Sequence, residues 1–187
     1  MTDARVIKTK QKLYRAMGEL LDEKSFDEIT VIDLAQQAHT TRKTFYSHYQ
    51  DKIELIEEYE NQIFDELSKL QAHYKFLDKN YITTYFRHIG NQDLLLKGLL
   101  SYNGSLEMQN LFKEGMYQEA QKLLSLKIKD KTKLNYAALI FANGLFGVTQ
   151  YWLMNGKKES PEEMADIIIH LGLLPGAIFE ENHRKTD

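Results

Sequence analysis

The spacing of apolar residues along the chain predicts a protein built from helices. Leu13, Met17 and Leu20 recur at three- and four-residue intervals, which is the period of one helix face. Similar spacing continues through most of the chain, whereas the strict alternation expected of a half-buried strand is scarce. The two prolines, Pro161 and Pro175, both lie near the C-terminal end, so little interrupts the earlier helical pattern. We therefore predict an all-α fold.

Capping signals and apolar runs set the expected helix limits. Thr30 and Asp33 form a capping box, Thr40 or Thr41 suits the N-cap of the following helix, and Ser160 precedes Pro161 as a further N-cap. Apolar positions after residue 52 predict one long helix of roughly seven turns, interrupted at Glu60. The expected helices cover 4–22, 31–38, 42–49, 52–77, 79–89, 92–100, 106–127, 131–154 and 161–174.

Residues 42–49 carry the most specific signal in the chain. On a helix, Phe45 and Tyr49 share the inward face, and the other side chains point outward. That outward face is almost free of carboxylates and consists of side chains that donate hydrogen bonds: Arg42, Lys43, Thr44, Tyr46, Ser47 and His48. Such donors bind phosphate oxygens and base edges, and two short helices joined by a three-residue turn have helix-turn-helix geometry. The alternative is an ordinary solvated face, which would normally mix acidic and basic residues.

Basic residues gather at the start of the chain, although the whole protein has a net charge of −3. The first expected helix carries a positive face opposite its apolar one, formed by Arg5, Lys8, Lys12 and Arg15. Lys52 lies at the expected N-terminus of the long helix, where free N–H groups and the helix dipole favour a phosphate. We therefore expect an anion-binding segment at the start of the chain, the alternative being a helix terminus whose charges serve only solubility.

Residues 29–38, 41–49 and 51–52 together resemble the signature of the TetR/AcrR family of transcriptional regulators, and the likeness extends over about residues 5–60. The resemblance implies a homodimer that binds a pseudo-palindromic double-stranded DNA operator. It implies phosphate contacts by Tyr46 and Lys52 and base contacts by Arg42, Lys43 and His48. The expected DNA-binding residues are Thr30, Arg42, Lys43, Thr44, Tyr46, Ser47, His48 and Lys52.

Two positions depart from the family pattern. Many members have Gly in place of Lys43, so the additional charge changes the surface that would meet the operator. Most members have Phe in place of Tyr49, a difference that we expect to alter only packing. Residues 143–163 are similar to the C-terminal region of one TetR subgroup, in which the last two long helices pair with their symmetry mates.

The second part of the chain is expected to hold a ligand pocket and a dimer interface. Its aromatic and Met residues are candidates to line a cavity, although most aromatic residues at helical spacing are simply core. The candidate pocket residues are Tyr81, Tyr85, His88, Tyr102, Met108 and Phe112. Small residues along 131–154 permit close approach of another helix, and the candidate interface residues are Ala142, Gly147, Tyr151, Ile168 and Leu171.

Sequence motifs for catalysis are absent. The chain has no Cys and none of the motifs G-x-S-x-G, Walker A, G-x-G-x-x-G or H-E-x-x-H, so we expect neither an enzyme nor a cofactor. Asp166 with His170, and Glu180 with His183, are spaced for a shared metal, but ordinary surface pairs are the expected outcome and no metal site is predicted. We see no membrane span or signal peptide and expect a cytoplasmic protein.

The expected architecture is a three-helix DNA-binding head at residues 1–52, joined by the long helix to a helical ligand-binding and dimerisation body at 53–187. We expect a repressor whose operator binding changes when an unknown small molecule tilts the long helix. In one alternative the body has no cavity and a partner protein regulates it. In another the chain is a helical binding module whose head recruits a protein and binds no operator.

Overall fold

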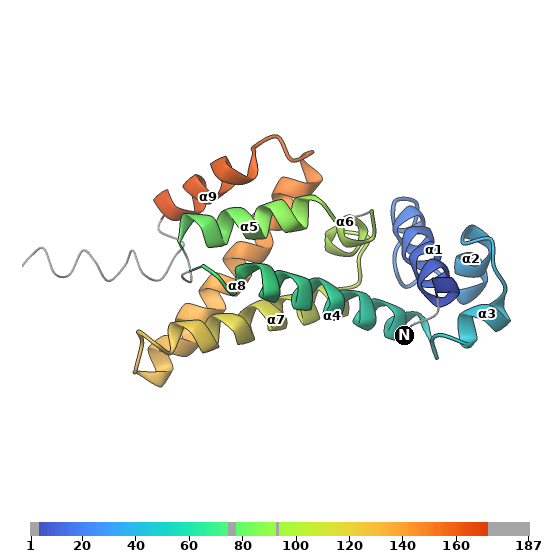
Figure 1. The fold of residues 1–187 in the computed structure, drawn as a ribbon, viewed down its shortest axis with the longest axis horizontal. Helices are drawn as coiled ribbons and strands as arrows, with labels where there is room; N and C mark the ends of the chain where they lie inside the picture. The colour runs from blue at the N-terminus through green and yellow to red at the C-terminus, as the bar shows by residue number, and fades with distance from the viewer. Residues whose placement is uncertain (1–3, 75–77, 93, 172–187) are drawn as a thin grey trace, which may run out of the picture. The chain divides into compact units, whose positions relative to one another are not determined.

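The structure is a computed structural model that describes residues 4–74, 78–92 and 94–171, without the side chains of Gln71 and Met108. The described chain is helical throughout, which confirms the predicted fold class (Figure 1). Its helices are α1 (Ala4–Leu21), α2 (Val31–Gln37), α3 (Arg42–Tyr46), α4 (Lys52–Gln71), α5 (Lys79–Gly90), α6 (Leu94–Leu100), α7 (Leu106–Leu124), α8 (Lys131–Met154) and α9 (Pro161–His170).

Several helix limits follow directly from the capping residues that the sequence offers. Thr30 and Ser160 each close a capping box, with Asp33 and Glu163 as the respective partners. Thr41 caps α3 by accepting a hydrogen bond from the backbone N–H of Thr44. These interactions satisfy backbone donors that a helix start leaves without a partner, so the starts of α2, α3 and α9 fall where the sequence predicts them.

The long helix α4 is shorter than predicted. It ends at Gln71, and the chain turns before Tyr74, so the expectation that it extends to about Leu77 is wrong at this end. The apolar pattern continues past the helix, but Leu70 and Tyr74 are exposed, so their burial contributes little to stabilising a longer helix. Leu77 itself lies outside the described residues. Glu60 does not interrupt the buried face of α4, because its own side chain is buried there.

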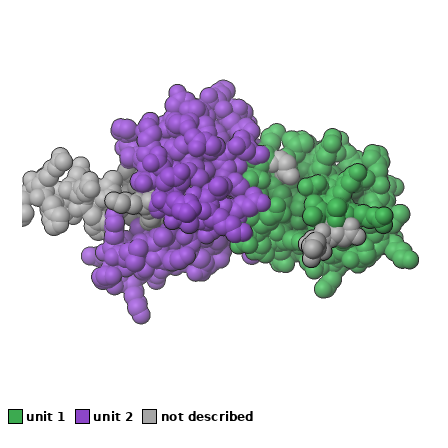
Figure 2. Space-filling model, viewed as in Figure 1, with its two compact units in different colours: residues 1–65, 92–109 green, residues 66–91, 110–187 purple. Residues whose placement is uncertain are grey.

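The chain forms two compact units, which Figure 2 shows in different colours. Unit 1 comprises residues 1–65 and 92–109, and unit 2 comprises 66–91 and 110–187. The predicted division at residues 52 and 53 was drawn by function, whereas unit 1 also takes in α6 and most of α4. The functional division stays a prediction.

Close packing of α1 on α6 explains why α6 belongs to unit 1. A Cβ atom at Gly18 would lie 2.6 Å from the backbone N of Leu95, and one at Gly98 would lie 2.8 Å from the Cβ of Leu21. The two helices therefore approach each other through glycines on both sides, at a distance that larger residues would prevent.

Unit 2 contains α5, α8 and α9. The helices α5 and α9 lie side by side and are joined by ion pairs of Lys79 with Asp166 and of Arg87 with Glu162. The helix α8 is long and apolar enough to cross a membrane by length and composition, but the same properties suit a helix of a protein core. Nearly half of that stretch, 44%, is buried inside this protein.

Candidate nucleic-acid interface

The helix α3 is only five residues long and depends on its neighbours for its position. The Phe45 side chain is fully buried, and Tyr49, three residues after the helix ends, is buried beside it at a ring distance of 5.8 Å. These two rings form the inward side of the segment, as the sequence predicts. The polar side chains between them are consequently turned outward.

Four of the eight predicted DNA-binding residues present donors that no protein group uses, within the part of the chain that the structure describes. Arg42, Lys43 and Tyr46 are exposed and His48 is half-buried, and none of their polar atoms has a hydrogen-bond or ion-pair partner there. The Arg42 guanidinium lies 6.0 Å from the centre of the Tyr46 ring, close enough for a weak cation–π attraction. This cluster of Arg42, Lys43, Tyr46 and His48 is the donor face.

The other four predicted residues make hydrogen bonds within the protein. The Thr30 hydroxyl donates to Asp33, and the Thr44 hydroxyl lies 2.9 Å from that of Thr41. The Ser47 hydroxyl donates to the Thr44 carbonyl at 2.7 Å. Lys52 donates its ammonium hydrogens to backbone carbonyls in the α1–α2 connection. Sequence position alone did not separate these residues from the donor face.

Other basic side chains of unit 1 are also paired. Lys24 binds Asp33 at 2.8 Å, and Arg15 binds Glu19 at 2.8 Å. The Lys24 ammonium, together with hydrogen bonds from Thr30, lowers the pKa of Asp33 to about 2. The negative charge of Asp33 beside α2 is therefore neutralised locally by Lys24.

A buried polar cluster joins α1, the end of the α3 segment and α4. The Tyr49 hydroxyl donates to that of Tyr14 at 3.4 Å, and Lys10 pairs with Glu58 at 2.5 Å. Burial alone would raise the pKa of Glu58, but Lys10 and the two phenols outweigh it and hold that pKa below its usual value. The expectation that Tyr49 alters only packing is therefore wrong, because its hydroxyl takes part in this cluster.

Glu60 is a buried carboxyl group on the apolar side of α4. Burial, and to a smaller extent the neighbouring Glu57 carboxylate, raises the pKa of Glu60 to about 8. In the sequence, Glu60 stands out only as a break in the apolar stripe, which does not indicate that the acid itself is buried.

The predicted pocket residues do not form a single described cavity. Tyr81, Tyr85 and Phe112 are buried in the core, and the Tyr85 hydroxyl lies 2.9 Å from that of Thr149. Tyr102 is 89% exposed in unit 1, so it lines no enclosed space. His88, another of the predicted residues, has its ring nitrogen Nε2 3.8 Å from a carboxylate oxygen of Glu66. The Met108 side chain lies outside the described part of the chain.

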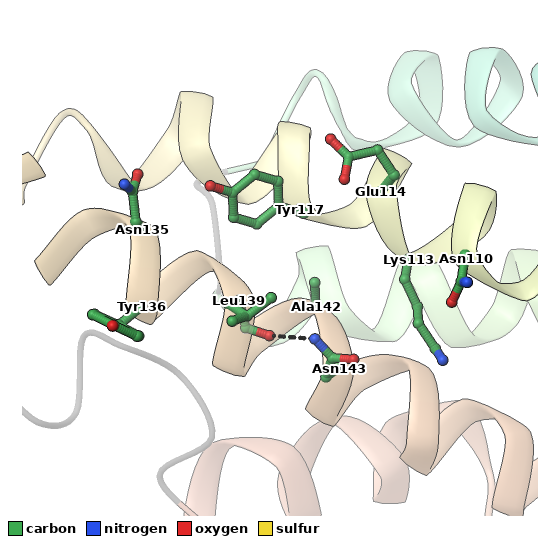
Figure 3. A pocket seen from close by; sticks show the side chains of 9 residues that line it. All are labelled: Asn110, Lys113, Glu114, Tyr117, Asn135, Tyr136, Leu139, Ala142 and Asn143. Atoms are coloured by element: carbon green, nitrogen blue, oxygen red, sulfur yellow. Dashed lines mark hydrogen bonds between the residues drawn. The ribbon is translucent and has the colours of Figure 1, made fainter. Parts of the chain in front are cut away.

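A different cavity opens between α7 and α8 within unit 2 (Figure 3). Its volume is about 460 Å³, and it is lined by Asn110, Lys113, Glu114, Tyr117, Asn135, Tyr136, Leu139, Ala142 and Asn143. The Lys113 ammonium lies 4.5 Å from the centre of the Phe146 ring, and Gln121 hydrogen-bonds both Tyr117 and Asn135. Amide, phenol and charged groups therefore share the lining with the apolar side chains of Leu139 and Ala142. None of the predicted pocket residues lines this α7–α8 cleft.

The predicted interface residues fall into two groups. Gly147 is exposed, and Tyr151 and Leu171 are 72% and 68% exposed, so they are accessible to a second molecule. Ala142 and Ile168 are buried in the core of the protomer, which leaves them little surface for a partner. Helical spacing placed all five near one another but did not indicate which side each occupies.

The residues that could share a metal have other partners. The Asp166 carboxylate pairs with Lys79, and the His170 ring lies 2.7 Å from the Asp166 carbonyl oxygen. Glu180 and His183 lie outside the described residues. No group of three or more potential metal ligands occurs within the described chain.

A helix-turn-helix with an exposed donor face, in a chain that is otherwise helical, is typical of a DNA-binding regulator. A model for bacterial regulatory proteins of the tetR family matches residues 9–59, and a model named TetR_C_8, for a transcriptional regulator C-terminal region, matches residues 79–172. The chain belongs to the TetR family of transcriptional regulators.

Individual relatives agree with this assignment. The chain is 38% identical over 56 residues to the uncharacterized HTH-type transcriptional regulator YxbF of Bacillus subtilis (strain 168), a match that covers 29% of this chain and 15% of that protein. A TetR transcriptional regulator from Streptococcus agalactiae 2603V has a TM-score of 0.69 at 23% identity, covering 90% of this chain and 96% of the other. NalD, described as the secondary repressor of the MexAB-OprM multidrug efflux pump in Pseudomonas aeruginosa, has a TM-score of 0.65 at 18% identity, covering 88% and 94%. The two structures share the fold.

The buried Glu60 predicts a stability that falls as the pH rises. Between the ordinary carboxyl pKa of 4.5 and about 8, the folded protein keeps a proton that the unfolded chain has released. The free energy of unfolding should then decrease by up to about 1.4 kcal/mol per pH unit in this window. Urea unfolding from pH 5 to 9 measures this, and Glu60→Gln should flatten the dependence.

Glu57→Gln, at the exposed neighbouring position, is the matched control and should keep most of the pH dependence. If the free energy of unfolding fell equally with rising pH in the wild type and in Glu60→Gln, another titrating group would be responsible for the pH dependence.

Proposed function

We propose that this protein is a homodimeric transcriptional regulator that binds a pseudo-palindromic DNA operator through the donor face of α3. This proposal rests on one observation: the donors of Arg42, Lys43, Tyr46 and His48 have no partner within the described residues. Other polar side chains of the segment, such as Ser47, hydrogen-bond to the protein itself. Arginine and lysine read guanine edges in the major groove, and tyrosine hydroxyls donate to phosphates. We propose these roles for the donor face.

Substitutions in the donor face should separate base contacts from phosphate contacts. Arg42→Ala and Lys43→Ala should reduce the preference for the operator over unrelated DNA, by about 1–3 kcal/mol where a bidentate contact to guanine is lost. Tyr46→Phe should weaken binding to all sequences alike, since a phosphate contact carries no sequence information. Fluorescence anisotropy with operator and scrambled duplexes measures both effects.

Lys69→Ala is the control, because Lys69 is an exposed cation in the last turn of α4, outside unit 1. The affinity of Lys69→Ala for operator DNA should match that of the parent protein. If all three donor-face variants also bound like the parent, α3 would not be the recognition helix.

The second copy is proposed to pack on the exposed apolar face of α8 and α9. This face is formed by Tyr136, Leu139, Ile140, Tyr151, Ile167 and Leu171, all exposed in the protomer. A shallow depression between the two helices, lined by Ile140, Phe141, Gly144, Leu145 and Ile168, continues this apolar surface. Large exposed apolar faces mark interaction sites, and a two-fold operator requires a two-fold protein.

A bulky residue at Gly147 should prevent dimer formation without unfolding the protomer. No atom lies within 4 Å of a Cβ placed at this glycine, so Gly147→Trp has room in one copy but would project into the partner. Sedimentation at micromolar concentration should show a monomer with an unchanged helical circular dichroism spectrum. Gln118→Trp, on the exposed side of α7, should remain dimeric. A dimeric Gly147→Trp would place the interface elsewhere.

We further propose a repressor that acts in the cytoplasm and is released from DNA by a small molecule bound in the α7–α8 cleft. Tyr136 and Leu139 belong both to the cleft and to the proposed dimer face, so an occupant would change the surface that the partner meets. A ligand shifts such an equilibrium only by its differential affinity for the two arrangements, and a tenfold loss of operator affinity requires about 1.4 kcal/mol. The described residues carry no feature that favours catalysis over binding.

Substitutions in the cleft should change the response to an effector before they change DNA binding. In a metabolite screen for release of operator DNA, Tyr117→Ala and Asn143→Ala should shift the effective concentration at least tenfold, since both side chains line the cleft. Tyr85→Phe, which changes only the buried contact with Thr149, serves as the control. An unaltered response in both cleft variants would exclude this site, and release only by an added protein would favour a protein partner.

A further inference from the structure

The connection between α1 and α2 turns three backbone carbonyl groups toward one lysine side chain. Lys52 Nζ donates to the carbonyl oxygens of Phe26 at 2.6 Å, Asp27 at 3.2 Å and Ile29 at 2.8 Å. An ammonium group has three hydrogens, so all of its donors are used in these bonds. The Lys52 side chain therefore binds its own protein where the family resemblance implies a phosphate contact.

The surroundings of the ammonium favour this internal arrangement. Lys52 Nζ lies 4.5 Å from the centre of the Phe26 ring, which is itself buried, so the cation gains a cation–π attraction. Burial lowers the pKa of Lys52, which opposes the charged form, so the three carbonyl bonds and the Phe26 ring have to offset this cost. Turning the ammonium outward to a phosphate would leave three carbonyl groups without this partner, two of them at part-buried contacts.

The same connection is held from its other side. The Phe26 backbone N–H donates to the Asn103 carbonyl at 2.8 Å, and the Asn103 side chain donates to the Leu21 carbonyl at 2.9 Å. Phe26 thus has its N–H bound by the chain after α6 and its carbonyl bound by α4. One residue after Ile29 comes Thr30, the N-cap of α2, so the start of the helix-turn-helix is fixed by these contacts.

The N-terminus of α4 is likewise occupied by the protein itself. Asp51 Oδ1 accepts hydrogen bonds from the backbone N–H groups of Ile53 at 2.8 Å and Glu54 at 2.9 Å. A helix N-terminus binds phosphate through such free N–H groups, and the carboxylate of Asp51 both uses them and repels an anion. Asp51 thus uses two of the N–H groups expected to bind a phosphate here, and the Lys52 ammonium is occupied as well.

We propose that Lys52 is a positioning residue for DNA binding: it fixes the α1–α2 connection, and through it α2 and α3, on the start of α4, and it makes no phosphate contact. The proposal rests on the proposed DNA-binding function. The consequence is that operator affinity depends on the three-donor geometry of this ammonium, through the position that it gives to α2 and α3.

Two substitutions of Lys52 distinguish a positioning role from a phosphate contact. Lys52→Arg keeps the charge but replaces a compact three-donor group with a planar fork, which cannot direct three hydrogens at these three carbonyls. A positioning role predicts at least tenfold weaker operator binding by this variant, measured where circular dichroism shows it fully folded. Lys52→Met should have a lower melting temperature and weaker binding, but the same slope of log affinity against log salt concentration as the parent.

Lys43→Met is the matched control, because the exposed Lys43 ammonium has no protein partner in the described chain, so its loss should weaken operator binding at an unchanged melting temperature. A phosphate contact by Lys52 would instead appear as a salt slope lowered by about 0.9 in Lys52→Met. Lys52→Met with that lower slope and an unchanged melting temperature would overturn the proposal, as would Lys52→Arg with parental or tighter binding. So would a folded Lys52→Met that loses stability but no affinity. If the parent bound no DNA, the proposed function would fail, while the melting temperatures would still test the Lys52 contacts.

Discussion

A helix of five residues cannot stay folded by itself, because helix formation must first overcome a costly nucleation step. The position of the donor face therefore depends on contacts between α3 and the rest of unit 1. Buried Phe45 and Tyr49 fix α3 from one side, Thr41 caps its start, and Tyr49 continues into the polar cluster with Tyr14. The outward side chains are not needed to hold the helix, because the inward ones already determine where it lies, so we propose that they are available for DNA.

The polar residues of unit 1 divide into two groups with different tasks. Lys10, Lys24 and Lys52 bind groups of the protein, and each bond joins parts of the chain that are distant in sequence. Arg42 and Lys43 have no such partner within the described residues and remain available to a ligand. A count of basic residues would overestimate the DNA-binding surface, because internal pairing removes much of that charge from contact with phosphate.

Much of the fold could be predicted from the sequence because helical period and caps are local properties. The limits of α8 and the starts of α2 and α9 agree with the prediction for this reason. The contacts of a side chain depend on segments that are distant in the sequence, so they could be predicted less well. It did not show that Ala142 faces the core, or that α7 and α8 leave a cleft between them.

We propose that two copies of α3 read a two-fold DNA site. Selection of duplexes from a random library by the purified full chain, followed by sequencing, tests this proposal. We expect enrichment of a pseudo-palindrome whose half-site centres lie about 34–36 Å apart, one turn of DNA, or a multiple of it. A library that remains unenriched, or that yields a single half-site without a symmetry-related mate, would contradict it.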